Sequence, residues 1–213
     1  MAMVHELRIY TVKPGTVMEV AKNAGEVGRA IRGDTYGKLE GYWVTEIGPL
    51  NQVCHLWSYS DWNERTRLRG ELAKNERWTK EYGPLIRPNL VRQDIRLLNP
   101  IVGIKPPTGT GNIYELRAYR TKPGAIKEWS TNFTEALHHR EKYSKIVGFW
   151  NTEAGQPNEV VHLWSYPDLN TRMAQRAASQ KDENWQAFIK KAGGLLEELT
   201  CMIMLPAAHS PLK

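Results

Sequence analysis

The stretch HELRIYTVKPG at residues 5–15 returns almost unchanged as YELRAYRTKPG at residues 114–124. A second stretch behaves in the same way, because HLWSY at residues 55–59 is repeated without change at residues 162–166. Equivalent residues are 109 apart in the first pair and 107 apart in the second, so one copy lacks two residues in between. A period of this length is a whole domain rather than a solenoid unit. The sequence therefore predicts the duplication of one domain.

The chain of 213 residues is long enough for two such domains. We expect them at residues 1–99 and 112–206. Residues 100–111 contain the prolines and glycines that are typical of a linker. Residues 207–213 form a polar tail with His209, which we expect to be mobile.

The composition is that of a globular protein, with 41% hydrophobic and 24% charged residues. No apolar run approaches the roughly 18 residues of a membrane helix, and no secretory pattern is visible at the N-terminus. We therefore expect a cytoplasmic protein without a membrane partner. The net charge is +6, but the basic residues are dispersed and no run of Lys and Arg exceeds two. This distribution does not favour nucleic-acid binding.

Each copy predicts the element order βαββαβ, the ferredoxin-like unit of the α+β class. Turn residues at Lys13–Gly15 separate the first strand from the first helix. Asp61 is the expected N-cap of the second helix. The first copy is expected to have strands at about residues 4–12, 39–46, 52–59 and 91–97, and helices at about 16–32 and 61–82.

Two helices can cover only one face of such a four-stranded sheet. Side-chain alternation places Leu7 and Ile9 on one face of the first strand, and Glu6, Arg8 and Tyr10 on the other. We expect the aliphatic face to lie under the helices and the polar, aromatic face to be open. The open faces of both domains would then pack sheet to sheet. One chain would form the pseudo-dimeric α/β barrel that otherwise needs two molecules.

The repeated motifs resemble those of the NIPSNAP domain, a member of the dimeric α/β-barrel superfamily. The resemblance rests on YELRxYxxKPG, on HLWSYxDLNxRxxxR, and on an acidic-x-Trp motif at residues 76–78 and 183–185. It is strong for the second copy and looser for the first, where Trp62 stands in place of Leu169. It implies a barrel of two ferredoxin-like halves, each with a cleft between sheet and helices. The superfamily includes cofactor-free monooxygenases, haem-dependent peroxidases, isomerases and stress-response proteins. The resemblance therefore implies no single reaction, because fold does not determine function.

Two equivalent sets of polar and aromatic residues are the candidate site. A histidine could accept a proton near neutral pH, an arginine could hold a carboxylate or enolate oxygen, and aromatic rings could hold a flat ligand. The candidate catalytic residues are His55 and Arg8, with their counterparts His162 and Arg117. The candidate ligand-binding residues are Glu6, Tyr10, Trp57, Tyr59, Glu115, Tyr119, Trp164 and Tyr166.

The same residues also fit a purely structural network, because buried charges have to be paired. The pairs Arg65/Arg69 and Arg172/Arg176 likewise fit either a basic rim for anionic ligands or a solvated helix face. One hypothesis is a small-molecule protein, such as a cofactor-free oxygenase or isomerase acting on a flat or acidic molecule. The other is a non-enzymatic binding, adaptor or stress-related protein whose barrel interior is only a core.

The sequence contains no recognisable metal-ligand spacing and no nucleotide-binding motif. We therefore expect no metal and no cofactor, although the resemblance leaves haem binding open. The expected partner is a small molecule. Whether the pseudo-dimeric chain also forms a homodimer stays open at this point.

Overall fold

The computed structural model describes residues 3–213 of the chain. Two compact units can be distinguished. Unit 1 comprises the residues up to Leu98 together with Met204–Lys213, and unit 2 comprises Asn99–Ile203. The C-terminal segment therefore belongs to the unit that is built from the first copy.

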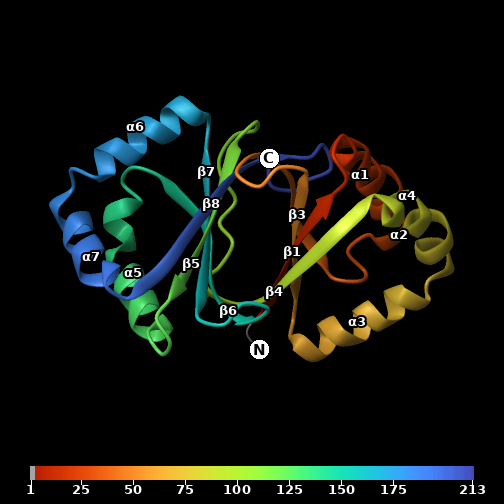
Figure 1. Ribbon diagram of the computed structural model, residues 1–213, viewed down its shortest axis with the longest axis horizontal. Coiled ribbons are helices and arrows are strands. Elements are labelled where there is room, and N and C mark those ends of the chain that lie inside the picture. Colours follow the sequence, from red (N-terminus) through yellow and green to blue (C-terminus); the bar gives the residue numbers. More distant parts are fainter. Residues whose placement is uncertain (1–2) are drawn as a thin grey trace. The chain divides into compact units, whose positions relative to one another are not determined.

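Unit 1 follows the predicted βαββαβ order (Figure 1). Its strands are β1 (Val4–Val12), β2 (Lys38–Ile47), β3 (Gln52–Tyr59) and β4 (Leu90–Val102), the last of which continues into unit 2. The first helical segment consists of α1 (Val17–Asn23), η1 (Ala24–Gly28) and α2 (Arg29–Arg32). The second consists of α3 (Trp62–Lys74), η2 (Trp78–Tyr82), α4 (Gly83–Ile86) and η3 (Arg87–Asn89).

Unit 2 repeats this order with more regular helices. Its strands are β5 (Ile113–Thr121), β6 (Lys145–Ala154), β7 (Glu159–Tyr166) and β8 (Leu196–Pro206). Its helices are α5 (Ile126–Arg140), α6 (Leu169–Ser179) and α7 (Glu183–Gly193). Within the described chain, no helix combines the length and the apolar character that a membrane span requires.

The strands are antiparallel, and their register is the same in both units. Arg8 of β1 lies opposite His55 of β3, and Arg117 of β5 lies opposite His162 of β7. The hydrogen-bonded strand order, β1-β3-β2-β8-β5-β7-β6-β4, is that of a closed barrel. The predicted fold class, an α+β chain of two tandem ferredoxin-like domains with the strand order of an α/β barrel, is therefore confirmed.

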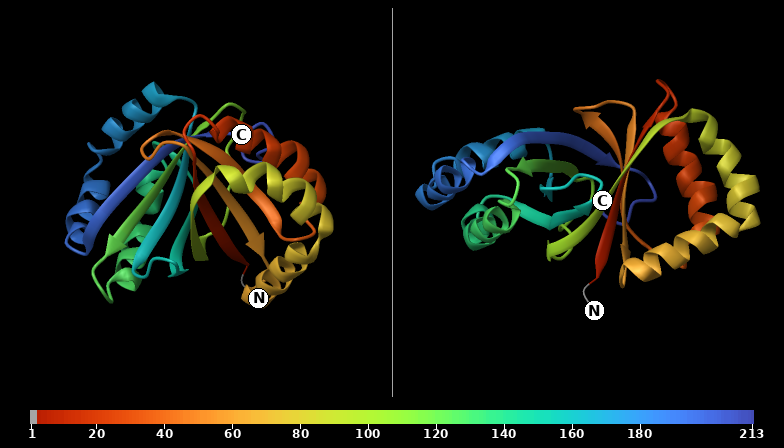
Figure 2. Two further views of the ribbon diagram at one scale, coloured as in Figure 1. Left: turned by 45° about the vertical axis from the view of Figure 1, so that its right-hand side comes forward. Right: turned by 60° about the horizontal axis from the view of Figure 1, so that its bottom comes forward.

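The helices of each unit lie together on one face of its strands (Figures 1 and 2). The expectation about which face they cover is wrong. The helix-side core of unit 1 contains Val4, Val12, Trp57 and Tyr59, which lie on the same face as the polar and aromatic candidate residues. The aliphatic residues of β1 point to the opposite face and are buried as well. Because both faces are buried, polarity could not identify the side on which the helices lie.

The first helical segment of unit 1 is not a continuous α-helix as predicted. Its middle turn, η1, is π-helical, and so is η2 in the second segment. Each π-helical turn corresponds to one additional residue. The span from Val20 to Arg32 is one residue longer than its counterpart from Trp129 to Arg140. A single inserted residue is accommodated in a helix by widening one turn, and such turns are frequent at functional sites.

The second segment shows the same insertion. Lys13 donates its backbone N–H to Asn89, and Lys122 donates to Leu195, so Asn89 and Leu195 occupy equivalent positions. The span from Trp78 to Asn89 is one residue longer than the span from Trp185 to Leu195. Both π-helical turns therefore distinguish unit 1 from unit 2.

The expectation of a mobile C-terminal tail is also wrong. The backbone N–H of Ala207 donates to the carbonyl oxygen of Tyr42 at 2.9 Å, and the N–H of Tyr42 donates to Ser210 Oγ at 2.9 Å. Ser210 and Leu212 are 1% and 4% exposed. The tail is thus bound to β2, where it places His209 against the Tyr42 ring.

We expect the substitution Gly41→Ala to destabilise the protein by about 1–3 kcal/mol, the usual cost of overpacking. A Cβ at this position of β2 would lie 2.1 Å from Cη2 of Trp43, whose side chain is buried. Gly70→Ala is the matched control, because it lies inside α3 with no atom near its Cβ. It should stabilise the protein by about 0.5–1 kcal/mol. Urea unfolding midpoints measure both effects, and equal midpoints for G41A and wild type would contradict the close packing.

Candidate functional site

A cavity of about 250 Å³ lies between the sheet and the helices of unit 1. Residues of β1, β2 and β3 line one side, and residues of α1, η1, η2 and α4 line the other. No acidic residue is found among the described residues that line it. The lining contains the rings of Tyr10, Tyr42, His55, Trp57, Trp78 and Tyr82 and the arginines Arg8, Arg29, Arg32, Arg69 and Arg87.

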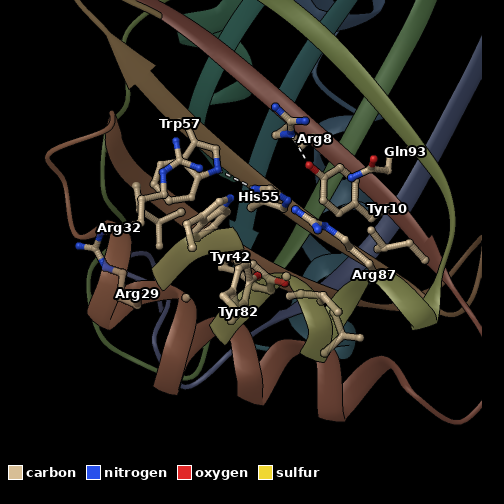
Figure 3. A pocket seen from close by; sticks show the side chains of 18 of the residues that line it. Arg8, Tyr10, Arg29, Arg32, Tyr42, His55, Trp57, Tyr82, Arg87 and Gln93 are labelled. Carbon is tan, nitrogen blue, oxygen red and sulfur yellow. Dashed lines mark hydrogen bonds between the residues drawn. The ribbon is translucent and has the colours of Figure 1, made fainter. Parts of the chain in front are cut away.

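His55 lies in the wall of this cavity, between two tyrosine rings (Figure 3). Its ring stacks on Tyr42 at 5.2 Å between centroids and meets Tyr10 edge-on at 4.9 Å. The indole Nε1–H of Trp57 donates to His55 Nδ1 at 2.6 Å. Because an indole N–H can only donate, Nδ1 must accept and the neutral ring carries its proton on Nε2. His55 is therefore held as a hydrogen-bond donor at Nε2.

The surroundings of His55 disfavour its protonated form. Burial lowers the pKa of His55 well below its ordinary value, and the neighbouring guanidiniums of Arg8, Arg32 and Arg69 lower it further. The ring is thus neutral at physiological pH. Its Nδ1 lone pair is already used by Trp57, so the arrangement suits the donation of a hydrogen bond to a ligand oxygen better than the removal of a proton.

Arg8 is fixed in position by its neighbours on β1. Its Nη1 donates to Glu6 and its Nε donates to Tyr10, both on the same strand face. The second carboxylate oxygen of Glu6 accepts from Arg65 of α3. Burial alone would raise the pKa of Glu6, but the pairing with Arg8 and Arg65 outweighs it and holds the pKa below its ordinary value. A charged network thus connects the cavity wall to the helix behind it.

Arg32 closes the other end of the aromatic wall. Its Cζ lies 3.3 Å from the ring centroid of Trp57, a close cation–π contact. Its Nη2 donates to the carbonyl oxygen of Tyr36 at 2.8 Å and to Tyr59 Oη at 3.0 Å. The side chain is almost completely buried, and this burial lowers the pKa of Arg32 to about 10. The guanidinium nevertheless stays charged at neutral pH.

The structure brings the first predicted set together, but not all of its members line the cavity. Arg8, Tyr10, His55 and Trp57 do so. Glu6 and Tyr59 lie behind the lining, where they hold Arg8 and Arg32 respectively. The roles of these residues in ligand binding stay predictions.

Several lining residues were not predicted. Tyr42 recurs as Phe149 and Arg32 as Arg140, so the repeat contained a signal for both. Arg69 was noted only as one half of a basic helix pair. Trp78 of η2 recurs as Trp185, so the acidic-x-Trp motif contained a signal for it too. Nothing local in the sequence points to the others, which come from η2, the tail, α2, η3 and β4: Tyr82, His209, Arg29, Arg87 and Gln93.

The basic helix pairs do not form a solvated face. Arg65 is bound to the buried Glu6, and Arg172 donates to Glu115 at 2.6 Å. Arg69 lines the cavity of unit 1, and Arg176 lines a cavity in unit 2. Each pair thus places one guanidinium on a buried carboxylate and the other in a cavity.

The cavity of unit 2 has a volume of about 350 Å³ and is lined by a different set of side chains. Its predicted lining residues are Arg117, Tyr119 and Trp164, and it also contains Arg140, Arg176 and the rings of Trp129, Phe133, Trp185 and Phe188. Glu115 and Tyr166 again lie behind the arginines, since Arg117 donates to Glu115 at 2.7 Å and Arg140 donates to Tyr166 at 3.4 Å.

His162 is shielded from this second cavity. Its Nδ1 accepts from Trp164 at 2.6 Å, as in unit 1. The rings of Phe133 and Trp129, however, lie 5.3 and 6.3 Å from it, where unit 1 has the smaller Ala24 and Val20. His162 is 3% exposed, and its Nε2 has no hydrogen-bond partner among the described residues. Only the first histidine of the repeat therefore has open space beside it.

Comparison with known proteins assigns the family. The NIPSNAP family model matches the chain twice, at residues 5–102 and 114–211. The chain belongs to the NIPSNAP family. It is similar to human protein NipSnap homolog 3A, with 32% identity over 217 residues that cover 98% of this chain and 85% of the human protein.

Two solved structures have the same fold as this NIPSNAP chain. A candidate monooxygenase from Fusobacterium nucleatum aligns with a TM-score of 0.73 and 11% identity, covering 97% of this chain and 93% of that protein. An anthrone oxidase-like protein aligns with a TM-score of 0.67 and 12% identity, covering 97% and 92%. At such low identity these likenesses show the fold alone.

Glu6→Gln should destabilise the protein by about 3–5 kcal/mol, because two guanidiniums would lose the carboxylate that they share. In the wild type, the lowered pKa of Glu6 means that this stabilisation is present above the unfolded-chain value of 4.5 and is lost as the pH falls through the folded value. Unfolding in denaturant at neutral and acidic pH measures both effects.

Glu81→Gln is the control for that experiment. Its exposed ion pair with Arg77 should contribute little to stability, because water and salt screen the two charges. Equal losses for E6Q and E81Q would show that the buried network does not stabilise the fold.

Proposed function

We propose that this NIPSNAP protein binds a small flat molecule with an anionic group in the unit 1 cavity. The observation that carries the proposal is the lining, in which aromatic rings and arginines occur together without an acidic residue among the described lining residues. Aromatic walls bury and stack on a flat ring, and guanidiniums bind carboxylate or phosphate oxygens. A cavity of about 250 Å³ suits a small ligand rather than a large cofactor.

His55 would orient the ligand by donating from Nε2 to one of its oxygens. This position lies beside Tyr10 and close to Arg8, so a hydrogen-bond donor and a cation face the same space. Such a group stabilises an anionic oxygen, including that of an enolate. The proposal is therefore one of binding and anion stabilisation, with no reaction assigned.

Two differences between the copies support unit 1 as the working copy. Both π-helical turns belong to unit 1, and residues of both line its cavity. The residues that shield His162 in unit 2 are replaced by Val20 and Ala24, which leave His55 accessible. Gly28 of η1 allows the close approach of Tyr82 of η2, because a Cβ there would lie 2.7 Å from the tyrosine ring. The two inserted turns are thus packed against each other at the cavity.

We expect 1-naphthoate, a flat carboxylate, to bind the protein more tightly than the uncharged 1-naphthamide. Arg69→Gln should weaken naphthoate binding by about tenfold, the effect of one charge-assisted hydrogen bond, and leave naphthamide binding unchanged. Arg67→Gln is the matched control, because Arg67 is exposed on the same helix and pairs with Glu71. Isothermal titration calorimetry measures the affinity of wild type, R69Q and R67Q for both ligands. If neither probe binds, the non-enzymatic adaptor hypothesis gains support.

Ala24→Phe should abolish naphthoate binding, because the new ring would lie beside His55 as Phe133 lies beside His162. Phe133→Ala should leave the binding site of unit 1 intact, although it removes a large buried side chain and should lower the melting temperature. Calorimetric titration together with thermal unfolding separates the two effects. Loss of binding in F133A, with full binding in folded A24F, would assign the site to unit 2 instead.

A further inference from the structure

The charges around His55 do not balance. Arg8, Arg32 and Arg69 all lie close enough to lower the pKa of the His55 ring. Glu6 is the carboxylate of this cluster, and it is shared between Arg8 and Arg65. Among the described residues, no carboxylate forms an ion pair with Arg32 or with Arg69. Beside His55, the cavity wall therefore carries two guanidiniums, those of Arg32 and Arg69, whose charge is not paired.

Arg32 shows this imbalance most clearly. Its side chain is 3% exposed, and both of its hydrogen bonds leave from Nη2 and go to uncharged oxygen atoms. Its Nε is buried and has no hydrogen-bond partner in the described part of the chain. A buried guanidinium with a free donor is costly unless an anion completes its hydrogen bonds. Arg32 lines the cavity, so a ligand could supply that anion.

Unit 2 satisfies the equivalent arginines more fully. Arg176, the counterpart of Arg69, lies 3.8 Å from the carboxylate of Glu115. Arg140, the counterpart of Arg32, donates from both terminal nitrogens, to Ser144 at 2.7 Å and to Tyr166 at 3.4 Å. The unsatisfied guanidiniums are thus a property of unit 1, where the cavity reaches the histidine.

We propose that the anionic group recognised in unit 1 is a dianion, namely a phosphate monoester carried by a flat ring, held between Arg32 and Arg69. This inference rests on the proposed function and specifies its ligand class. A single carboxylate would balance one of the two guanidiniums, whereas a phosphate monoester carries nearly two charges at neutral pH and offers three acceptor oxygens. The planar guanidinium fork matches such oxygens in a bidentate manner.

The test compares 1-naphthyl phosphate with 1-naphthyl sulfate, which has the same ring and nearly the same shape but a single charge. Isothermal titration calorimetry at pH 7.5 should show about tenfold tighter binding of the phosphate. Lowering the pH to about 5 protonates the phosphate, whose second pKa is about 6, and should remove most of that preference. The sulfate affinity should not change with pH.

The protein should contribute little to this pH effect. His55 and His209, the two histidines of the lining, are neutral across the range, because burial holds the pKa of His55 well below its ordinary value and lowers that of His209 to about 4. The arginines of the cluster stay charged. The change in affinity therefore reports on the charge of the ligand.

Arg32→Gln and Arg69→Gln should each reduce the preference for phosphate over sulfate, and Arg67→Gln should preserve it. Arg69 is only partly buried, so R69Q tests the inference even if R32Q does not fold. Equal binding of phosphate and sulfate would overturn the dianion inference and leave the proposed function standing. If inorganic phosphate binds as tightly as naphthyl phosphate, the ring makes no contribution. That result would overturn the flat ring as a ligand feature in both the proposed function and the dianion inference. If no probe binds, both fail.

Discussion

The carboxylate of Glu6 is completely buried between a strand and a helix, and it accepts hydrogen bonds from Arg8 on one side and Arg65 on the other. A buried carboxylate can remain charged only with such partners. Its position therefore fixes how α3 packs against β1. Glu115 makes the equivalent contacts in unit 2. The ionic network thus stabilises the fold of each unit whether or not a ligand is bound.

The geometry of the cavity follows from this network. Glu6 and Tyr10 hold Arg8, and the strand register then sets Arg8 beside His55. Trp57, on the same strand as His55, fixes the tautomer of the ring. Arg8, Arg32 and His55 are thus each oriented by a second residue behind them. These three groups are ready to bind a ligand without rearrangement.

The repeat made the fold predictable, because two copies of one strand–helix pattern specify two ferredoxin-like units. The period of two along β1 and β3 also predicted correctly that Glu6, Arg8 and His55 share a face. Whether that face lies under the helices could not be predicted, because residues on both faces of β1 are buried. The polar face is buried through ion pairing rather than through apolar character. Ion pairs between segments leave no local pattern in the sequence.

The inserted turns and the tail were missed for related reasons. The change of the repeat offset from 109 to 107 showed that residues had been inserted, but not that one of them widens a helix beside the cavity. The second π-helical turn lies beyond the last repeated motif. His209 reaches Tyr42 and Gly25 from the far end of the chain. Contacts of this kind depend on the completed fold and cannot be derived from spacing.

A duplicated chain provides its own comparison between structural and functional constraints. Glu6, Arg8 and Arg65 recur in unit 2 as Glu115, Arg117 and Arg172, so the stability of each unit is sufficient to explain this ionic network. The apolar residues beside the two histidines differ: Trp129 and Phe133 fill the space in unit 2, whereas Val20 and Ala24 leave it open. Open space in a core and a buried guanidinium without an ionic partner, such as that of Arg32, both destabilise a fold. Unit 1 carries both at the same place, and a bound anionic ring would remove both at once.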